Sequence, residues 1–515
     1  MMSQREDSIK MNRSRSLVTI TRIFMLALGF IYLMSGLGMA QDMATDDPLF
    51  VKVHRVIVNN SEILTEEEIQ AIIDLVVGQE MSMEQLQAVI EQINELYREK
   101  SFITARAILP PQTIVDGVVR IELVEGTVGD IVVEGNRATR EGYFLKRLSL
   151  QQGDLVRLDV LEKDLSYFNA TNDVQVRAEI RAGREFGLTD LVLRAVEPTK
   201  TQVVAFVDNG GRKETGLYRL GVSALNNSLF GIRDTVNVSA TYAQGTLGIN
   251  MAYDVPVSRR GARLAVNYDR TKTTIVSGTF EAVGIDGLST NTGVRVSHPI
   301  VVKPQLKLSG ALGWQAKQTD NYFSGVKLQS ARLQTAVFSL TGQFFGNNQS
   351  WSGQQDIILG RIELPDEGDY VKYFGTVTWQ RALYRNGLLT VQGLLQLTNN
   401  QLLPFSEQLS LGGMSIARGY PEGTLIGDKG FAISAELTYP IGECLRGMVF
   451  LDYGGVFPYK GNDESITKED YLVSCGLGAT VRIGERVFAN VVVGWPIGAK
   501  GGSPQFHLSL QTKLW

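Results

Sequence analysis

The 515-residue sequence is poor in the residues that usually mark a site of chemistry. It contains two cysteines, three histidines and 14 prolines. Two cysteines cannot build a disulfide scaffold. The three histidines, His54, His298 and His507, lie in separate segments without the spacing of metal ligands. Neither a Gly-x-Ser-x-Gly elbow nor a phosphate-binding Gly-Lys-Ser/Thr loop occurs. We therefore expect a chain that is not an enzyme and needs neither a metal nor a cofactor.

The sequence also lacks an excess of positive charge and a second long apolar run. The formal net charge is −4 and no basic stripe is present, so the composition does not indicate nucleic-acid binding. Beyond residue 40 no segment is apolar enough for a transmembrane helix. Any further membrane crossing therefore requires a closed β-barrel, the only other structure that satisfies every backbone group in lipid. The 53 glycines, 17 tyrosines and 21 phenylalanines fit a β-rich chain.

The first 40 residues have the pattern of a secretory signal peptide. Arg13, Arg15 and Arg22 precede the apolar stretch 23–39, and Gly38-Met39-Ala40 supplies the small residues that a signal peptidase needs. A retained membrane anchor is the alternative, because the apolar stretch is just long enough to span a bilayer. The acidic residues that follow favour cleavage. Residues 1–40 are therefore predicted to be removed, and Gln41 to begin the mature chain.

Residues 50–198 show a mixed α/β pattern that occurs twice. The first copy, 50–126, is predicted to have the order β-α-α-β-β, and the second copy, 127–198, repeats this order. The second helix of the first copy carries apolar residues at spacings of three and four, which indicates a buried stripe. The stripe consists of Leu86, Val89, Ile90, Ile93, Leu96 and Tyr97.

After residue 200, apolar and polar residues alternate to the end of the chain. A soluble β-sandwich shows the same alternation, but roughly 315 residues of about ten-residue strands without a helix are typical of an outer-membrane barrel. Region 201–515 is therefore predicted to be a transmembrane antiparallel β-barrel. The alternating runs number sixteen or seventeen. We expect sixteen, because two periplasmic ends require an even number, and place the misread run between Ser350 and Thr398.

A distinctive tetrapeptide lies in a predicted long extracellular-side loop between two late strands. It consists of Ala417, Arg418, Gly419 and Tyr420. The period of two places Glu436 in the next strand, and Phe450 and Asp452 in the strand after it, on the lumenal side. A carboxylate on that side is a suitable acceptor for a bidentate contact from an arginine such as Arg418, and Gly419 would allow a tight turn where a side chain would clash. A solvated loop arginine is the alternative.

The last strand and one loop carry two further patterns. The strand resembles the carboxy-terminal signal by which bacterial barrels are recognised for insertion, since Phe506, Leu508 and Leu510 alternate and the chain ends at Trp515. Trp515 is out of phase with the apolar set, so the last two residues are expected to turn or bulge. The second pattern is Leu109-Pro110-Pro111-Gln112. A Pro-Pro-Gln segment on its own is usually a strand-breaking turn.

These features in this order resemble the two-partner secretion transporters of the outer-membrane assembly-factor superfamily, and the two α/β copies resemble polypeptide-transport-associated (POTRA) domains. Further parts of the resemblance are Gly412-Gly413, the segment 431–437 and Phe450 to Gly454. Pro110, Pro111 and Gln112 look like the hinge between the paired domains. The family usually has valine where this chain has Ala417.

The resemblance implies a pore in the outer membrane of a Gram-negative-type cell, with the POTRA domains in the periplasm. The pore would recognise an unfolded exoprotein by its N-terminal secretion domain, and secrete and activate it at the cell surface. Outer-membrane lipid and the barrel-assembly machinery are the other implied partners. A conserved sixth loop, about 412–430, would fold into the lumen, where its arginine meets an acidic residue of the wall. In this chain the resemblance implies a pair of Arg418 with Asp452, with Glu436 nearby.

Two other functions are compatible with these features, and the chain differs from the family in one respect. A barrel-assembly insertase of the same superfamily is the first alternative, and a simple diffusion porin is the second. The family's members carry a plug helix and a linker ahead of the first domain. Only about nine residues separate Ala40 from Phe50, so we expect no full plug, which leaves the sixth loop as the seal of the lumen.

Overall fold

The computed structural model describes residues 50–364, 367–399, 402–457, 470–498 and 502–515. The predicted signal peptide, and the short segment before Phe50 on which the expectation about a plug rests, lie outside these residues. The described chain divides into two compact units, residues 50–97 with 106–124, and residues 98–105 with 125–515. Within the described ranges, no helix is both long enough and apolar enough to cross a membrane.

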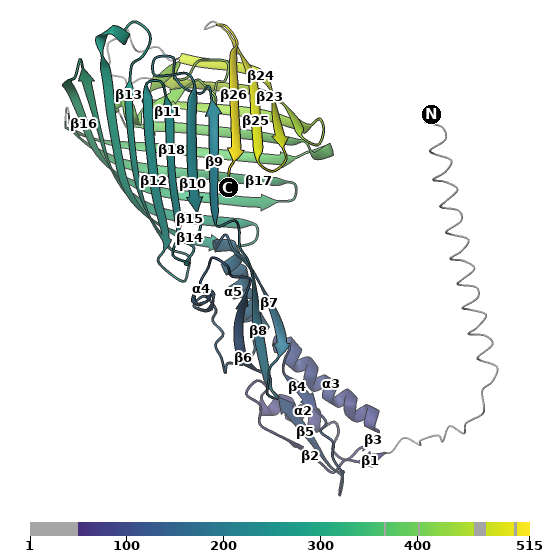
Figure 1. Ribbon diagram of the computed structural model, residues 1–515. Coiled ribbons are helices and arrows are strands. Elements are labelled where there is room, and N and C mark those ends of the chain that lie inside the picture. Colours follow the sequence, from purple (N-terminus) through teal and green to yellow (C-terminus); the bar gives the residue numbers. More distant parts are fainter. Residues whose placement is uncertain (1–49, 365–366, 400–401, 458–469, 499–501) are drawn as a thin grey trace, which may run out of the picture. The chain divides into compact units, whose positions relative to one another are not determined.

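The first α/β domain is a small sheet with helices packed on it (Figure 1). Its elements are β1 (Val51–Lys52), β2 (Arg55–Val58), α2 (Glu66–Ile73), β3 (Glu80–Met81), α3 (Met83–Glu99), β4 (Arg106–Ile108) and β5 (Val118–Val124). Thr65 and Glu68 form a capping box that begins α2. β5 is the central strand, parallel to β2 and antiparallel to β4. The predicted stripe of α3 is buried at five of its six positions, which gives this domain its core.

The second α/β domain repeats this topology. Its elements are β6 (Thr127–Glu134), α4 (Glu141–Leu145), α5 (Leu158–Thr171), β7 (Gln175–Ala182) and β8 (Leu188–Val196). The central strand β8 is parallel to β6 and antiparallel to β7. Tyr143 and Phe144 of α4 pack on Phe168 of α5 in the core. The same strand order in two consecutive segments agrees with the repeat predicted from the sequence.

The segment from Pro110 to Gln112 is not a hinge between the two domains, so that prediction is wrong. It lies in the loop between β4 and β5, which are neighbours in one sheet. Gln112 fastens this loop to β5, because its side-chain amide donates to the carbonyl oxygen of Arg120 at 2.8 Å and accepts from the Arg120 N–H at 2.8 Å. The prolines therefore shape a turn within the first domain.

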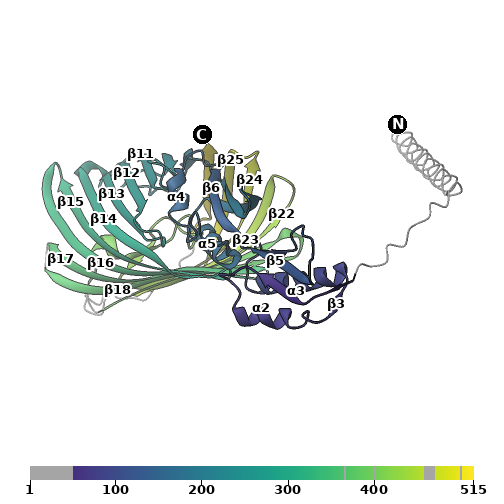
Figure 2. The same ribbon diagram turned by 90° about the horizontal axis from the view of Figure 1, so that it is seen from below.

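Sixteen of the strands in the described residues form a closed antiparallel barrel (Figures 1 and 2). The strands are β9 (Thr201–Asp208), β10 (Arg219–Asn226), β11 (Thr235–Ala243), β12 (Thr246–Pro256), β13 (Arg263–Thr274), β14 (Ile285–Val302), β15 (Leu306–Phe323), β16 (Val326–Gly346), β17 (Gln349–Leu364), β18 (Gly368–Ala382), β19 (Leu388–Thr398), β22 (Lys429–Pro440), β23 (Leu445–Phe457), β24 (Asp470–Ile483), β25 (Val487–Ile497) and β26 (Gln505–Lys513). The sixteen strands confirm the even number expected, and three of them, β17, β18 and β19, span Ser350 to Thr398.

Alternation along each strand produces an apolar outer face and a polar inner face. On β12, Leu247, Ile249 and Met251 share an exposed face, whereas Asn250 points the other way and donates a hydrogen bond to Asp269 on β13. The ring closes where β26 pairs with β9, from Ser509 opposite Asp208 to Lys513 opposite Val204. An apolar exterior of this kind is what a barrel presents to lipid.

The end of the last strand follows the predicted phase. Phe506, Leu508 and Leu510 are exposed on the outer face. β26 ends at Lys513, so Trp515 lies beyond the strand, where its carbonyl oxygen accepts a hydrogen bond from the Val203 N–H at 3.0 Å. The final two residues therefore leave the regular ladder, which accounts for the out-of-phase aromatic.

Candidate functional site in the barrel lumen

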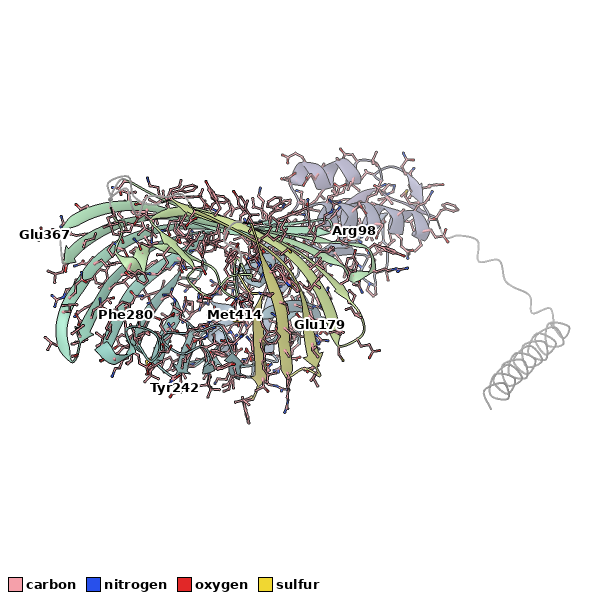
Figure 3. The ribbon with its side chains drawn as sticks, turned by 90° about the horizontal axis from the view of Figure 1, so that it is seen from above. Arg98, Glu179, Tyr242, Phe280, Glu367 and Met414 are labelled. Carbon is pink, nitrogen blue, oxygen red and sulfur yellow. The ribbon has the colours of Figure 1, made fainter. Side chains whose placement is uncertain are left out.

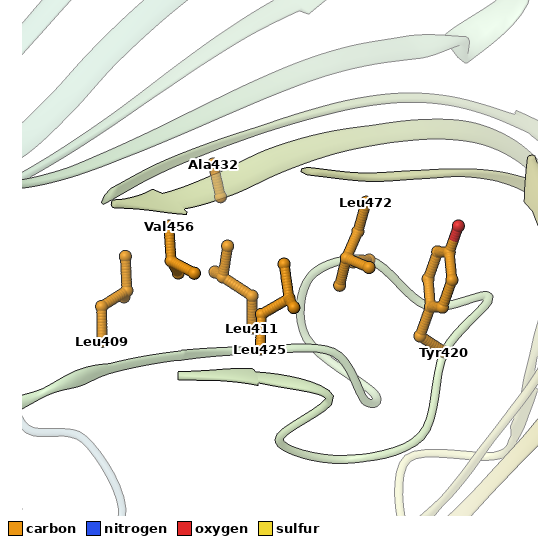
Figure 4. Packing of buried hydrophobic residues seen from close by; sticks show 8 residues of the cluster. Leu409, Leu411, Tyr420, Leu425, Ala432, Val456 and Leu472 are labelled. Carbon is orange, nitrogen blue, oxygen red and sulfur yellow. The ribbon is translucent and has the colours of Figure 1, made fainter. Parts of the chain in front are cut away.

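The long connection between β19 and β22 folds into the barrel. It contains a short hairpin of β20 (Leu409–Leu411) and β21 (Leu425–Gly427). The hairpin packs on the inner side of β22, β23 and β24, as Figure 4 shows, where its leucines contact Ala432, Val456 and Leu472. Met414, near the tip of the loop, lies inside the ring of strands in the view from above (Figure 3). This apolar packing fixes the hairpin on one part of the barrel wall.

Arg418 at the tip of this loop is bound to Asp452 on β23. Its Nε donates to Asp452 Oδ2 at 3.0 Å and its Nη2 donates to Oδ1 at 2.9 Å. The backbone N–H of Arg418 also donates to Oδ2, at 3.0 Å. Arg418 is 6% exposed and Asp452 is fully buried. A paired, doubly bonded charge of this kind is the arrangement in which burying an arginine is tolerated.

The other side chains around the Arg418 guanidinium come from β22 and β23. Nη1 donates to Glu436 Oε2 at 2.9 Å, and Nη2 donates to the hydroxyl of Ser434 at 3.0 Å. Ser434 in turn donates to Asp452 at 2.7 Å. The guanidinium carbon lies 3.6 Å from the ring centroid of Phe450, in cation–π geometry. The structure thus brings together Arg418, Asp452, Glu436 and Phe450, and their combined formal charge is negative.

Glycine at position 419 is required by a close approach rather than by its backbone angle. A Cβ there would lie 2.6 Å from the carbonyl carbon of Trp495 and 2.7 Å from the nitrogen of Pro496, both on β25. Facing it, a Cβ at Gly494 would lie 2.4 Å from the carbonyl oxygen of Arg418. The left-handed residue is Ala417, with φ of 59°. Alanine has no β-branch, and this lowers the strain of that conformation relative to valine.

Three further contacts join the tetrapeptide to β24, β25 and β26. The hydroxyl of Tyr420 donates to the carbonyl oxygens of Val473 on β24 and Ile497 on β25, at 3.2 and 3.3 Å. Nε2 of His507 on β26 lies 2.7 Å from the carbonyl oxygen of Arg418. The sequence analysis did not assign His507 to this site. The signal was available, because a residue between the outward Phe506 and Leu508 must face inward.

A second buried polar cluster holds the start of the same loop and was also missed. The carboxylate of Glu407, which ends a short 3₁₀ turn, accepts hydrogen bonds from the ammonium groups of Lys317 on β15 and Lys372 on β18. Nζ of Lys372 also donates to the Glu407 carbonyl oxygen at 3.2 Å. Glu407 is 3% exposed and Lys372 is 7% exposed. Alternation places the two lysines inward, but no sequence period identifies their partner.

Other predicted features lie away from this loop. The C-terminal apolar set faces outward, and Pro110 to Gln112 belong to the first α/β domain. Cys444 is exposed, Cys475 is half-buried, and both are free. Among the described residues, no group of three or more His, Cys, Asp or Glu side chains is placed to hold a metal ion.

Comparison with known proteins gives matches over both parts of the chain. Residues 187–481 match the family described as "Haemolysin secretion/activation protein ShlB/FhaC/HecB", and residues 51–126 match the family described as "POTRA domain, ShlB-type". The heme/hemopexin transporter protein HuxB of Haemophilus influenzae strain 86-028NP is 26% identical over 471 residues, which cover 85% of this chain and 82% of HuxB.

Two outer membrane transporters named CdiB are also similar. CdiB of Escherichia coli O6:K15:H31 (strain 536 / UPEC) is 26% identical over 446 residues, which cover 80% of this chain and 73% of that protein. A solved structure of CdiB from Escherichia coli has the same fold, with a TM-score of 0.64, 20% sequence identity and coverage of 92% of this chain and 93% of that one. The barrel is thus an outer-membrane barrel, and the POTRA domains lie in the periplasm. Since the first family model covers more than half of the sequence, the chain belongs to the haemolysin secretion/activation family.

Proposed function

We infer that this protein is the outer-membrane pore of a two-partner secretion system, which carries an unfolded exoprotein from the periplasm to the cell surface. Family membership supports the transport activity, and the named relatives are transporters. The single observation that carries the mechanism is the buried contact of Arg418 with Asp452, which holds a loop inside the lumen. A chain that crosses the barrel has to share the lumen with this loop, so the loop acts as seal and gate.

The exoprotein is recognised in the periplasm through its N-terminal secretion domain. Strand β7 pairs with β8 on one side. On its other side the Asn169 side chain bonds the N–H and C=O of Val176, so the edge beyond Val176 is the part that an extended partner can join. Addition of a strand by the exoprotein needs no nucleotide. Folding of the exoprotein at the surface then gives the transport its direction and the released protein its activity.

Secretion of the exoprotein, which is to be sought first in the adjacent reading frame, tests the gate. Arg418→Ala and Asp452→Ala are each expected to reduce the exoprotein in the medium by at least about tenfold, because each leaves a buried charge without its partner. Heat-modifiable migration on gels reports whether each variant barrel is folded. Full secretion by both folded variants would remove the pair from the mechanism.

Strand addition is tested by placing proline at successive positions of β7 in the full-length protein. Proline removes an N–H donor, and N–H groups point to alternate sides of a strand. Binding of the secretion domain should therefore weaken at every second position. Equal weakening at all positions would point to unfolding of the domain, and no weakening would exclude this edge.

The insertase alternative predicts a different phenotype. An insertase is needed for many barrels, so its deletion lowers the amounts of other folded outer-membrane barrels. A dedicated transporter predicts loss of one exoprotein only. Quantifying the folded barrels and the secreted proteins of a deletion strain separates the two activities.

A further inference from the structure

The sixth loop contacts the barrel wall along its whole length. Its hairpin and tip lie on β22 to β26, where the contacts are the apolar cluster, Asp452 and His507. Its first arm reaches β15 and β18 through Glu407. In the order of the ring, β16, β17, β18, β19 and β22 lie between β15 and β23. The wall contacts of the loop run from β26 past β19, where Gln396 bonds Glu407, to Lys372 on β18, and the contact with Lys317 extends them to β15.

The contacts of the first arm are few and mostly ionic. Leu403 packs on Ile362 and Tyr370, and Glu407 accepts from two lysines. A lysine ammonium is a strongly hydrated point charge on a flexible stem. When such a contact opens into a water-filled lumen, the lysines and the carboxylate regain hydration. The apolar hairpin on the other wall has no such compensation, because its separation exposes leucine side chains to water.

The first arm is also held by polar contacts within the loop and by Gln396 of the wall strand β19. Asp428 Oδ1 accepts from the N–H of Leu403 at 2.9 Å and from the side chain of Gln408 at 3.2 Å. Gln396 of β19 donates to the carbonyl oxygens of both Glu407 and Asp428, each at 3.0 Å. These bonds tie the arm to the base of the loop. They do not involve β15 or Lys372, so they can persist when Glu407 leaves the lysines.

We propose that Glu407, Lys317 and Lys372 form a releasable latch, and that the exoprotein passes between the sixth loop and the wall of β15 to β18 when it opens. This inference rests on the proposed transport function for its second half. The latch closes that side of the lumen at rest. Its release lets the first arm move while the hairpin and Arg418 remain seated on β22 to β26.

Currents through the purified full-length protein in planar bilayers of phospholipid in KCl test the latch without an exoprotein. Glu407→Gln, and Lys317→Met combined with Lys372→Met, should each raise the open probability at least several-fold. The triple charge reversal Glu407→Lys, Lys317→Glu and Lys372→Glu should return it toward the parent value. The matched control is Asp369→Asn, which neutralises a carboxylate of a highly exposed pair with Arg361 and should leave the current unchanged.

A crosslinked version keeps the test decisive if a neutral variant does not fold. Cys444 and Cys475 are replaced by serine, and Glu407→Cys with Lys372→Cys is joined by a short thiol crosslinker that a reductant cleaves. Cleavage should raise both current and secretion. Unchanged current in the folded latch variants, or in the crosslinked protein after cleavage, would overturn the latch. Responsive current with secretion unaffected by the crosslink would overturn the exoprotein route. Responsive current in a chain that secretes no exoprotein under any condition would instead contradict the proposed function.

Discussion

The two ends of the sixth loop are fastened by different chemistry. Arg418 presents a planar fork to both oxygens of one carboxylate, stacks on Phe450 and adds its own backbone N–H to the contact. Glu407 presents one carboxylate to two lysines, from β15 and β18, which β16 and β17 separate in the ring. The first contact depends on shape as well as charge, whereas the second depends mainly on charge.

The difference indicates which changes each end tolerates. A fork contact fails when one donor moves by a fraction of an ångström, because both hydrogen bonds share one plane. A contact of point charges survives substitutions that keep the sign of the charge. The tip also lies directly against the backbone of β25. The first arm is instead bound by the ends of two long lysine side chains. Substitutions at the two ends of the loop test this difference.

The largest effect is expected for Gly419→Val. The new Cβ would lie 2.6 Å from the carbonyl carbon of Trp495 and 2.7 Å from the nitrogen of Pro496, which is a steric clash. The tip therefore cannot pack against β25, and Arg418 loses its contact with Asp452. Secretion into the medium should become undetectable while the barrel still forms. Gly442→Val is the matched control, because Gly442 lies in the short turn between β22 and β23, where a Cβ meets nothing within 4 Å. Normal secretion by Gly419→Val would show that the seated tip is dispensable.

Loss of the carboxylate at Asp452 should have the next largest effect. Asp452→Ala leaves the buried guanidinium with Glu436 as its remaining carboxylate, and removing one partner of a buried pair costs about 3–5 kcal/mol. The temperature at which the folded band disappears in a heat-modifiability series should fall. Asp452→Asn keeps the size of the side chain and one acceptor oxygen, so the fall should be smaller. Equal transitions for the parent and Asp452→Ala would mean that the tip is held by its apolar packing.

Exchanging the two cations separates the ends most directly. Arg418→Lys should lower secretion about tenfold, since a lysine cannot reproduce the fork. Lys372→Arg keeps the charge beside Glu407 and should change secretion less than about twofold. The quantity to compare is exoprotein released per folded transporter. If Lys372→Arg were the more damaging change, the distinction between a shape-dependent end and a charge-dependent end would fail.

The smallest effect is expected for His507→Ala. The variant loses one hydrogen bond to the Arg418 carbonyl oxygen, which is worth about 1 kcal/mol. The heat-modifiability transition should fall slightly. His298→Ala serves as control, because His298 lies on the outer face of β14 and is exposed. A fall as large as that of Asp452→Ala would make β26 a main support of the tip.

Local patterns were enough to predict most of the architecture. The repeated α/β pattern, the period of two and the even number of strands predicted two small domains and a sixteen-strand barrel. They also placed Asp452 and Glu436 on the inner side, because side chains alternate strictly along a strand. Pro110 to Gln112 were misassigned because proline breaks a strand equally well inside a domain and between domains.

The sequence by itself determined which residues face the lumen, Asp452 among them, and the resemblance to a known family then indicated its pairing with Arg418. Only the tertiary structure decided how the loop crosses that lumen. Glu407 meets Lys317 and Lys372 because the curvature of the closed ring brings β15 and β18 within reach of one side chain, and neither periodicity nor sequence spacing encodes a contact across a cavity. The same holds for Gly419. A side chain at this position would clash with the backbone of β25, and only the folded loop brings the two together.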